Sequence, residues 1–248
     1  MDLKYEIYNS SCQFMNMIKD NSVKLVFTSP PYRDLKDYHN DWQIWYKQTY
    51  QDYLNDMKIV FSECYRVLDK ENWVFCININ SRVVNNKYYP IHIDFYRILK
   101  AIWFNFFDCF IWHKASWIPA PANKFSDRFE YVIIASMKEI SYKWNKSEWY
   151  LSDELNAIKS WHVKKKAGSL LSTQPHPAYF PIWLPEKAIS LYTEEWDLVL
   201  DPFMWIWSTL FAALNLKRSC VWFEINPDYI NTIDMTTPMQ FKGKIKFI

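Results

Sequence analysis

The sequence predicts a single α/β domain built on a mostly parallel β-sheet with helices on both faces. Three observations lead to this prediction. The chain has 248 residues, half of them hydrophobic, which is ample for one core. Short apolar segments typical of buried strands alternate with segments of helical spacing. Two of the apolar segments, 23–27 and 198–200, lead directly into proline-containing loops, and a strand cannot continue through consecutive prolines.

The expected elements follow one another in strand–helix–strand order. A short strand is expected within 5–12, and a brief helix at 15–19. Apolar residues in 50–68 recur at spacings of three and four, which predicts an amphipathic helix. Between strands 23–27 and 74–79, this helix makes the right-handed crossover of a parallel sheet. The remaining expected elements are a helix at 91–101, strands at 106–112 and 129–135, helices at 185–192 and 208–214, and strands at 198–201 and 220–224.

The first loop, Thr28-Ser29-Pro30-Pro31-Tyr32, has suitable chemistry for holding an amino group on a flat ring. The two prolines have no backbone N–H, so they offer acceptors only. Ser29 adds an acceptor hydroxyl, and Tyr32 adds a stacking surface. On these residues alone, a turn that simply ends a strand explains the segment equally well.

A second loop, near the other end of the chain, changes that balance. Here Asp201-Pro202-Phe203 ends a strand and leads into a helix that begins at Ser208-Thr209. The two loops, in this order, resemble those of the permuted beta class of DNA amino-methyltransferases, where an S/D-P-P-Y catalytic loop precedes a D-P-F-x-G-x-G-T cofactor loop. The resemblance covers nearly the whole chain. It implies a Rossmann-like methyltransferase that depends on S-adenosyl-L-methionine, with a mostly parallel seven-stranded sheet and the catalytic half first.

The resemblance also assigns a cofactor site. A helix amino terminus with its positive dipole suits the carboxylate of S-adenosyl-L-methionine. An acid at a strand end, Glu224, is implied to accept the ribose hydroxyls, and Ser11 and Cys12 to line the adenine end. The implied cofactor-binding residues are Asp201, Phe203, Trp205, Trp207, Ser208, Thr209, Glu224, Ser11 and Cys12.

The implied catalytic residues are Ser29, Pro30, Pro31 and Tyr32. A target base must leave the DNA duplex, and Tyr32 would stack on it. Ser29 and the carbonyl of Pro30 would accept hydrogen bonds from its amino group and so aim the nitrogen at the methyl donor. In the family, Ser before Pro-Pro-Tyr occurs mostly with cytosine N4, so cytosine is favoured over adenine N6.

The expected partner is double-stranded DNA. Its predicted contacts are Arg33 and the run Lys164, Lys165 and Lys166, although three lysines are also typical of a solvated surface, and a net charge of +2 leaves the partner open. The lysines lie in 137–172, expected to be a short target-recognition insertion between a catalytic half, 1–136, and a cofactor half, 173–248, of the same domain. The sequence leaves open whether a restriction endonuclease works with this chain.

The sequence is typical of a soluble cytoplasmic protein. No basic-then-apolar segment opens it, and no apolar run approaches about 18 residues. The five cysteines lack a C-x-x-C pair and lie mostly in apolar runs, so reduced core thiols are expected. No histidine stands at ligand spacing from a cysteine, so no metal site is expected.

Glycine is unusually rare. The chain has 2 glycines and 14 tryptophans, whereas average usage predicts roughly seventeen glycines. Tryptophan stands where glycine is expected at Trp73, Trp103, Trp196, Trp205, Trp207 and Trp222, which include both glycine positions of the cofactor loop. One hypothesis is that the gene uses UGA for glycine. The alternative is that the tryptophans are genuine and the chain is a nucleic-acid-binding module without catalysis.

Overall fold

The computed structural model describes residues 3–31, 44, 48–114, 129–139, 160–162, 180–204, 207–236 and 243–248. Its main sheet has nine strands in the order β11-β1-β10-β9-β2-β3-β7-β6-β8, and β4 and β5 form a separate hairpin. The strands are β1 Tyr5–Tyr8, β2 Leu25–Thr28, β3 Val74–Ile79, β4 Arg82–Val84, β5 Lys87–Tyr89, β6 Phe106–His113, β7 Phe129–Ser136, β8 Ser160–His162, β9 Leu198–Asp201, β10 Ser219–Phe223 and β11 Lys246–Phe247. The helices are α1 Tyr50–Val67, α2 Ile91–Ala101, α3 Trp183–Tyr192, α4 Ser208–Asn215 and α5 Pro227–Thr236.

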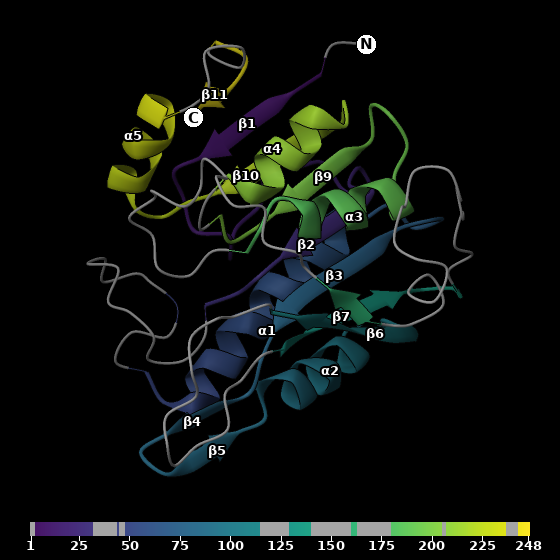
Figure 1. The fold of residues 1–248 in the computed structure, drawn as a ribbon, viewed down its shortest axis with the longest axis vertical. Helices are drawn as coiled ribbons and strands as arrows, with labels where there is room; N and C mark the ends of the chain where they lie inside the picture. The colour runs from purple at the N-terminus through teal and green to yellow at the C-terminus, as the bar shows by residue number, and fades with distance from the viewer. Residues whose placement is uncertain are drawn as a thin grey trace.

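Helices cover both faces of the sheet (Figure 1). Helices α1 and α2 pack on one face and α3 and α4 on the other. In β2, Leu25 and Phe27 belong to the core beneath α3 and α4, while Val26 belongs to the core beneath α1 and α2. Successive side chains of a strand point to opposite faces, so a strand that is apolar throughout supplies both cores. The predicted α/β architecture is therefore confirmed.

The seven expected strands are all present, as β1, β2, β3, β6, β7, β9 and β10. Strand β7 runs antiparallel to both β3 and β6, whereas the other neighbours in the sheet are parallel. Two short outer strands were not predicted, β8 with three residues and β11 with two. Segments of this length carry no readable alternation, so only pairing with a neighbour reveals them.

Helix α1 begins where its sequence provides a cap. The hydroxyl of Thr49 accepts a hydrogen bond from the backbone N–H of Asp52 at 3.2 Å, and the Asp52 carboxylate accepts one from the backbone N–H of Thr49 at 3.2 Å. This capping box satisfies two N–H groups that the first turn leaves open.

The helix expected at 15–19 is absent, and that expectation was wrong. Backbone groups of this segment bond to side chains of α1 instead. The guanidinium of Arg66 donates to the carbonyls of Met15 at 2.9 Å and Ile18 at 3.2 Å, and Glu63 accepts from the Met15 N–H at 3.1 Å. One turn bond remains, from the N–H of Ile18 to the carbonyl of Met15 at 2.9 Å, and contacts with α1 take the place of further helical hydrogen bonds.

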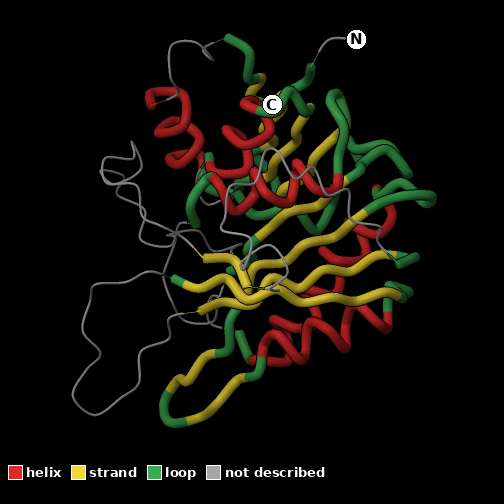
Figure 2. The backbone as a smooth tube through the Cα atoms, turned by 45° about the vertical axis from the view of Figure 1, so that its right-hand side comes forward, coloured by secondary structure: helices red, strands yellow, loops and turns green. Residues whose placement is uncertain are grey.

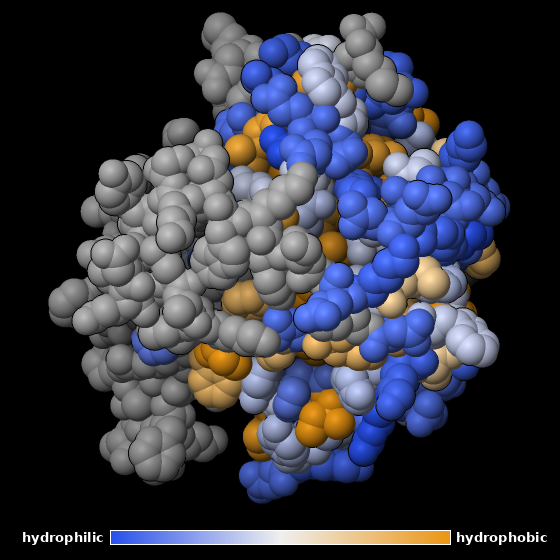
Figure 3. All heavy atoms as spheres, turned by 90° about the vertical axis from the view of Figure 1, so that its right-hand side faces the viewer, coloured by the Kyte–Doolittle hydropathy of each residue, from blue (hydrophilic) through white to orange (hydrophobic). Residues whose placement is uncertain are grey.

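All five cysteines are free thiols. Cys12, Cys64, Cys76 and Cys220 are buried as expected, but Cys109 on β6 is exposed. On the face of the molecule shown in Figure 3, the coloured side chains are mostly hydrophilic, with hydrophobic ones in small separate groups. Within the described ranges, no helix has the length and apolar character needed to cross a bilayer.

Candidate active site

The two proline-containing loops leave the sheet side by side. Strands β2 and β9 are parallel neighbours, with Leu25 opposite Val199 and Val26 opposite Leu200. Their following loops therefore start at the same side of the sheet, here called the carboxyl edge, where parallel α/β sheets hold their ligands. Figure 1 labels β2 and β9, and the backbone tube in Figure 2 shows the strands of the sheet side by side.

The carboxylate of Asp201 joins the two loops. Its Oδ1 accepts hydrogen bonds from the hydroxyl of Thr28 at 2.9 Å and from the backbone N–H of Phe203 at 3.1 Å. Its Oδ2 accepts one from the hydroxyl of Thr209, in α4, at 2.8 Å. Burial raises the pKa of Asp201 to about 7, and the three hydrogen bonds act in the opposite direction. This acid therefore fixes β2, β9 and α4 relative to one another.

The Ser29-Pro30-Pro31 loop is held from the other side by α1. Ser29, Pro30 and Pro31 are buried, and the hydroxyl of Tyr53 donates to the carbonyl of Pro31 at 3.0 Å. Tyr53 is itself fully buried in the core beneath α1. The start of the loop is thus anchored at Thr28 and at Pro31. Tyr32 and Arg33 lie outside the described residues, as do Lys164, Lys165 and Lys166.

The loop after β9 leads into α4 through Trp207. The hydroxyl of Ser208 donates to the carbonyl of Phe180 at 2.6 Å, which ties the start of α4 to the segment before α3. Trp207 is buried and stacks on Phe211 with ring centroids 5.7 Å apart. Its φ of −40° is available to any residue, so this position does not require glycine for its backbone. Trp205 lies outside the described residues.

Glu224 follows β10 at the same edge. Its backbone N–H donates to Tyr8 of β1 at 3.1 Å, and its Oε1 accepts from the N–H of Asn226 at 2.7 Å. Burial raises the pKa of Glu224 to about 8. Ser11 and Cys12 follow β1, the neighbour of β10. Burial raises the pKa of the Cys12 thiol, and the nearby carboxylates of Asp201 and Glu224 raise it further. The structure therefore brings Cys12, Asp201 and Glu224 together.

A polar cluster that sequence reasoning missed lies two strands from β9. Asn78 of β3 donates to the carboxylate of Glu130 in β7, and Lys114, just after β6, forms an ion pair with the same carboxylate. Asn78 and Glu130 are both buried. They lie near the Ser29-Pro30-Pro31 loop, since Thr28 stands opposite Ile77 in the parallel pairing of β2 with β3. The only signal in the sequence was a polar residue within each of two apolar strands.

Two tryptophans have the backbone conformation of glycine. Trp103 has φ of +85° and Trp196 has φ of +78°, in the left-handed region that bulky residues avoid. Trp73 and Trp222 lie outside that region, but both are buried, and their indole N–H groups have no hydrogen-bond partner among the described residues. A buried donor without a partner is costly.

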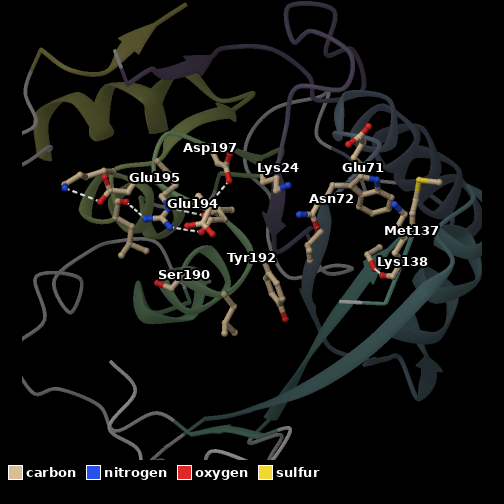
Figure 4. Close-up of a pocket in the computed structure, with 18 of the residues that line it drawn as sticks. Lys24, Glu71, Asn72, Met137, Lys138, Ser190, Tyr192, Glu194, Glu195 and Asp197 are labelled. Atoms are coloured by element: carbon tan, nitrogen blue, oxygen red, sulfur yellow. Dashed lines mark hydrogen bonds and ion pairs between the residues drawn. The ribbon is translucent and has the colours of Figure 1, made fainter. Parts of the chain in front are cut away.

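A cavity of about 840 Å³ lies at the opposite edge of the sheet (Figure 4). Lys24, Trp73 and Asp197, which precede β2, β3 and β9, belong to its lining. Acids and bases are mixed around it, and the guanidinium of Arg218 is already bonded to the carbonyl of Thr193 at 2.7 Å. We assign this cavity no ligand, because it lies at the edge of the sheet opposite to the two loops and Glu224.

The fold and the two loops define a Rossmann-like methyltransferase of the class that uses S-adenosyl-L-methionine. Residues 23–235 match the DNA methylase model of the N6/N4 methyltransferase family, so the chain belongs to that family of amino-methyltransferases. The family uses S-adenosyl-L-methionine.

The relatives include several type II methyltransferases. The chain is 25% identical to the type II methyltransferase M.BglII of Bacillus subtilis, over 91% of this chain and 67% of that protein. It is 26% identical to the type II beta methyltransferase M.BslI of Bacillus sp. strain NEB-606, over 90% of this chain but only 26% of that protein.

Two solved structures share the fold. A DNA modification methylase from Thermus thermophilus, in complex with S-adenosyl-L-methionine, aligns with a TM-score of 0.73 and 20% identity over 98% of this chain and 99% of that one. The cytosine-N4-specific PvuII DNA methyltransferase aligns with a TM-score of 0.73 and 19% identity over 98% of this chain and 89% of that one.

Proposed function

We propose that the chain is a site-specific DNA methyltransferase of the permuted beta class, which methylates the exocyclic amino group of a flipped base. The observation that carries this proposal is the junction at Asp201. Through Thr28 and Thr209, it fixes the Ser29-Pro30-Pro31 loop beside the loop into α4. A methyl acceptor held by the first loop then meets a methyl donor held by the second.

The described residues fit the cofactor. Glu224 is a partly buried carboxylate at a strand end, and its charged form is disfavoured because burial removes solvating donors. Two ribose hydroxyls would supply such donors. Asp201 has a different part, because its oxygens already accept three hydrogen bonds, so it shapes the loop rather than touching the ligand. Ser11 and Cys12 would border the adenine end, and Phe203, Ser208 and Thr209 the methionine end.

The bound cofactor supplies a methyl group activated by a positive sulfonium. The chain's own task is to hold the target amino group in line with it, which accounts for much of the rate in such transfers. The carbonyl of Pro31 already accepts from Tyr53. We therefore assign the amino hydrogens to Ser29 and the carbonyl of Pro30, and stacking on the base to Tyr32. Swinging the base out of the duplex costs a few kcal/mol, which these contacts offset.

Cytosine N4 is the favoured target. Ser29 precedes Pro-Pro-Tyr, as in family members that mostly modify cytosine, and the structural neighbour from the PvuII system is cytosine-N4-specific by name. Adenine N6 is the alternative, because a hydroxyl accepts equally well from either amino group.

DNA contacts are proposed for Arg33 and for Lys164, Lys165 and Lys166, within a target-recognition segment at 137–172. This segment would separate the catalytic half, 1–136, from the cofactor half, 173–248. The type II designation of the relatives supports a partner restriction endonuclease.

We further propose that the active protein carries glycine at the anomalous tryptophan positions, through UGA codons read as glycine. Trp103 and Trp196 support this, since a left-handed conformation costs a residue with a Cβ about 1–2 kcal/mol and costs glycine nothing. The side chains are 73% and 48% exposed, so packing offsets little of that cost. By the same codon, positions 205 and 207 would regain the family's cofactor loop.

Three measurements test these proposals. The codons at 103, 196, 205 and 207 should be UGA, and UGG at these positions would end the codon proposal. Calorimetry with S-adenosyl-L-methionine should show tighter binding after Trp205→Gly with Trp207→Gly. In thermal denaturation, Trp103→Gly with Trp196→Gly should raise Tm by several degrees, at roughly 2–4 °C per kcal/mol. The control Trp112→Gly, in the buried interior of β6, should lower it. A chain that binds DNA but never the cofactor would instead be the non-catalytic module.

A further inference from the structure

The β4–β5 hairpin stands apart from the main sheet. It is a two-stranded sheet of its own, with Val83 opposite Tyr88 and Val84 opposite Lys87. Asn85 and Asn86 have φ of +49° and +60°, which is the tight turn whose twist matches a hairpin. It follows β3 at the carboxyl edge and extends away from the main sheet at the lower end of the molecule (Figures 1 and 2).

Such a hairpin needs an anchor, because two strands alone are marginally stable in water. The anchor is Tyr89, which is buried and meets the ring of Tyr50 edge-on with centroids 4.8 Å apart. Tyr50 stacks on Tyr53 at 6.3 Å, and Tyr53 donates its hydroxyl to Pro31. Three tyrosines therefore connect the base of the hairpin to the catalytic loop.

Val84 also packs on the core beneath α1 and α2, whereas Val83 and residues 85–88 are exposed, and the hairpin carries positive charge. Residues 81–90 contain Arg82 and Lys87 and no acid. Neither cation is ion-paired to another described residue, and the buried Nε of Arg82 has no hydrogen-bond partner among them. Val83 and Tyr88 are cross-strand partners on one face, and they are 66% and 57% exposed. Apolar side chains this exposed do nothing for the core.

We propose that this hairpin is a DNA-binding ribbon that grips the duplex beside the flipped nucleotide, an inference that rests on the proposed function. A two-stranded ribbon fits the major groove of duplex DNA. Arg82 and Lys87 contact backbone phosphates, which fix register without reading sequence. Val83 and Tyr88 pack on the groove wall. The contacts among Tyr89, Tyr50 and Tyr53 then hold the bound duplex at a set distance from Ser29.

The test compares two double variants with the same charge change. Arg82→Ala with Lys87→Ala removes the cations of the hairpin. Lys100→Ala with Lys138→Ala removes two exposed lysines from the opposite edge of the sheet. Fluorescence anisotropy with a mixed-sequence duplex gives the affinity over a range of salt concentrations. Each phosphate that the protein no longer neutralises lowers the slope of log K against log salt by about 0.9, so the slope should fall by about 1.8 in the hairpin variant and much less in the control.

A third variant tests the apolar face. Val83→Ser with Tyr88→Ser should lower DNA affinity several-fold and leave the salt slope unchanged. Unaltered Tm and cofactor affinity show that each variant is folded. Equal slopes in the two charge variants would overturn the inference.

That failure differs from failure of the proposed function. If the hairpin is a bystander, its charge variant binds DNA normally while the parent, which carries glycine at positions 205 and 207, still transfers methyl groups. If the function is wrong, the parent transfers none.

Discussion

The hydroxyl of Thr28 donates a hydrogen bond to the carboxylate of Asp201 at 2.9 Å, across 173 positions of sequence. Thr28 ends β2, before the proposed catalytic loop, and Asp201 ends β9, before the proposed cofactor loop. Both are buried, so this bond is shielded from water and holds the two loops in one arrangement.

The burial of Asp201 predicts a pH-dependent stability. Its pKa is about 7 in the folded protein against an ordinary 3.8, so the folded state binds more protons between these values. The free energy of unfolding should therefore fall as pH rises from about 4 to 7, by at most about 1.4 kcal/mol per pH unit from this group. The raised pKa of Glu224 should likewise lower the free energy of unfolding as pH rises, up to about pH 8. Asp201→Asn should flatten the curve of Tm against pH below 7, and a variant with the full slope would contradict the assignment.

The hydroxyl of Tyr53 should matter for catalysis. Tyr53→Phe removes the hydrogen bond to the Pro31 carbonyl and should cost about 1 kcal/mol of stability. We expect kcat to fall as the loop loosens, while the dissociation constant for S-adenosyl-L-methionine stays the same. Tyr65→Phe, also on α1, is the matched control. It should leave both kcat and the dissociation constant for S-adenosyl-L-methionine unchanged. Steady-state kinetics with calorimetry would show this, and an unchanged kcat would mean that the loop does not need its α1 anchor.

Ser29→Ala should lower turnover more than cofactor affinity, because the hydroxyl is assigned to the target amino group. Tyr32→Ala should weaken both capture of the base and the rate. Single-turnover rates and cofactor dissociation constants separate the two effects. If either variant loses cofactor binding as much as it loses rate, the assignment of this loop to the target base is wrong.

The lysine run at 164–166 should contribute to DNA binding. Replacing Lys164, Lys165 and Lys166 with alanine should weaken binding and reduce its salt dependence, by roughly 0.9 in slope for each phosphate that these lysines neutralise. The measurement is a salt titration of the binding constant. An unchanged slope would make the run an ordinary solvated surface.

Local patterns in the sequence were enough to predict most elements. Strand Val74–Ile79 and helix Ile91–Ala101 have the expected bounds, because the strand is an almost continuous apolar run and the helix buries residues at a spacing of four. Helix α5 was not predicted. The helix expected at 15–19 failed because Arg66 and Glu63, far along the chain, take up its backbone groups.

The site was only partly predictable, because its contacts also join residues that are far apart in the sequence. Asp201 and Ser29 stand out in the sequence because each lies where an apolar segment meets a proline-containing loop. What Asp201 bonds to does not stand out, since Thr28 and Thr209 meet it only when the sheet forms. The same holds for Asn78 and Glu130, whose pairing depends on the register of β3 with β7.

The most direct test of the central claim is the identity of the modified nucleoside. DNA is incubated with the protein carrying glycine at positions 205 and 207 and with S-adenosyl-L-methionine labelled in its methyl group, then digested and separated. Ser29→Ala protein serves as the control and should transfer far less label. We predict label in N4-methylcytosine. Label in N6-methyladenine would reverse the choice of base, and label in neither nucleoside would contradict the proposal that this chain is a DNA amino-methyltransferase.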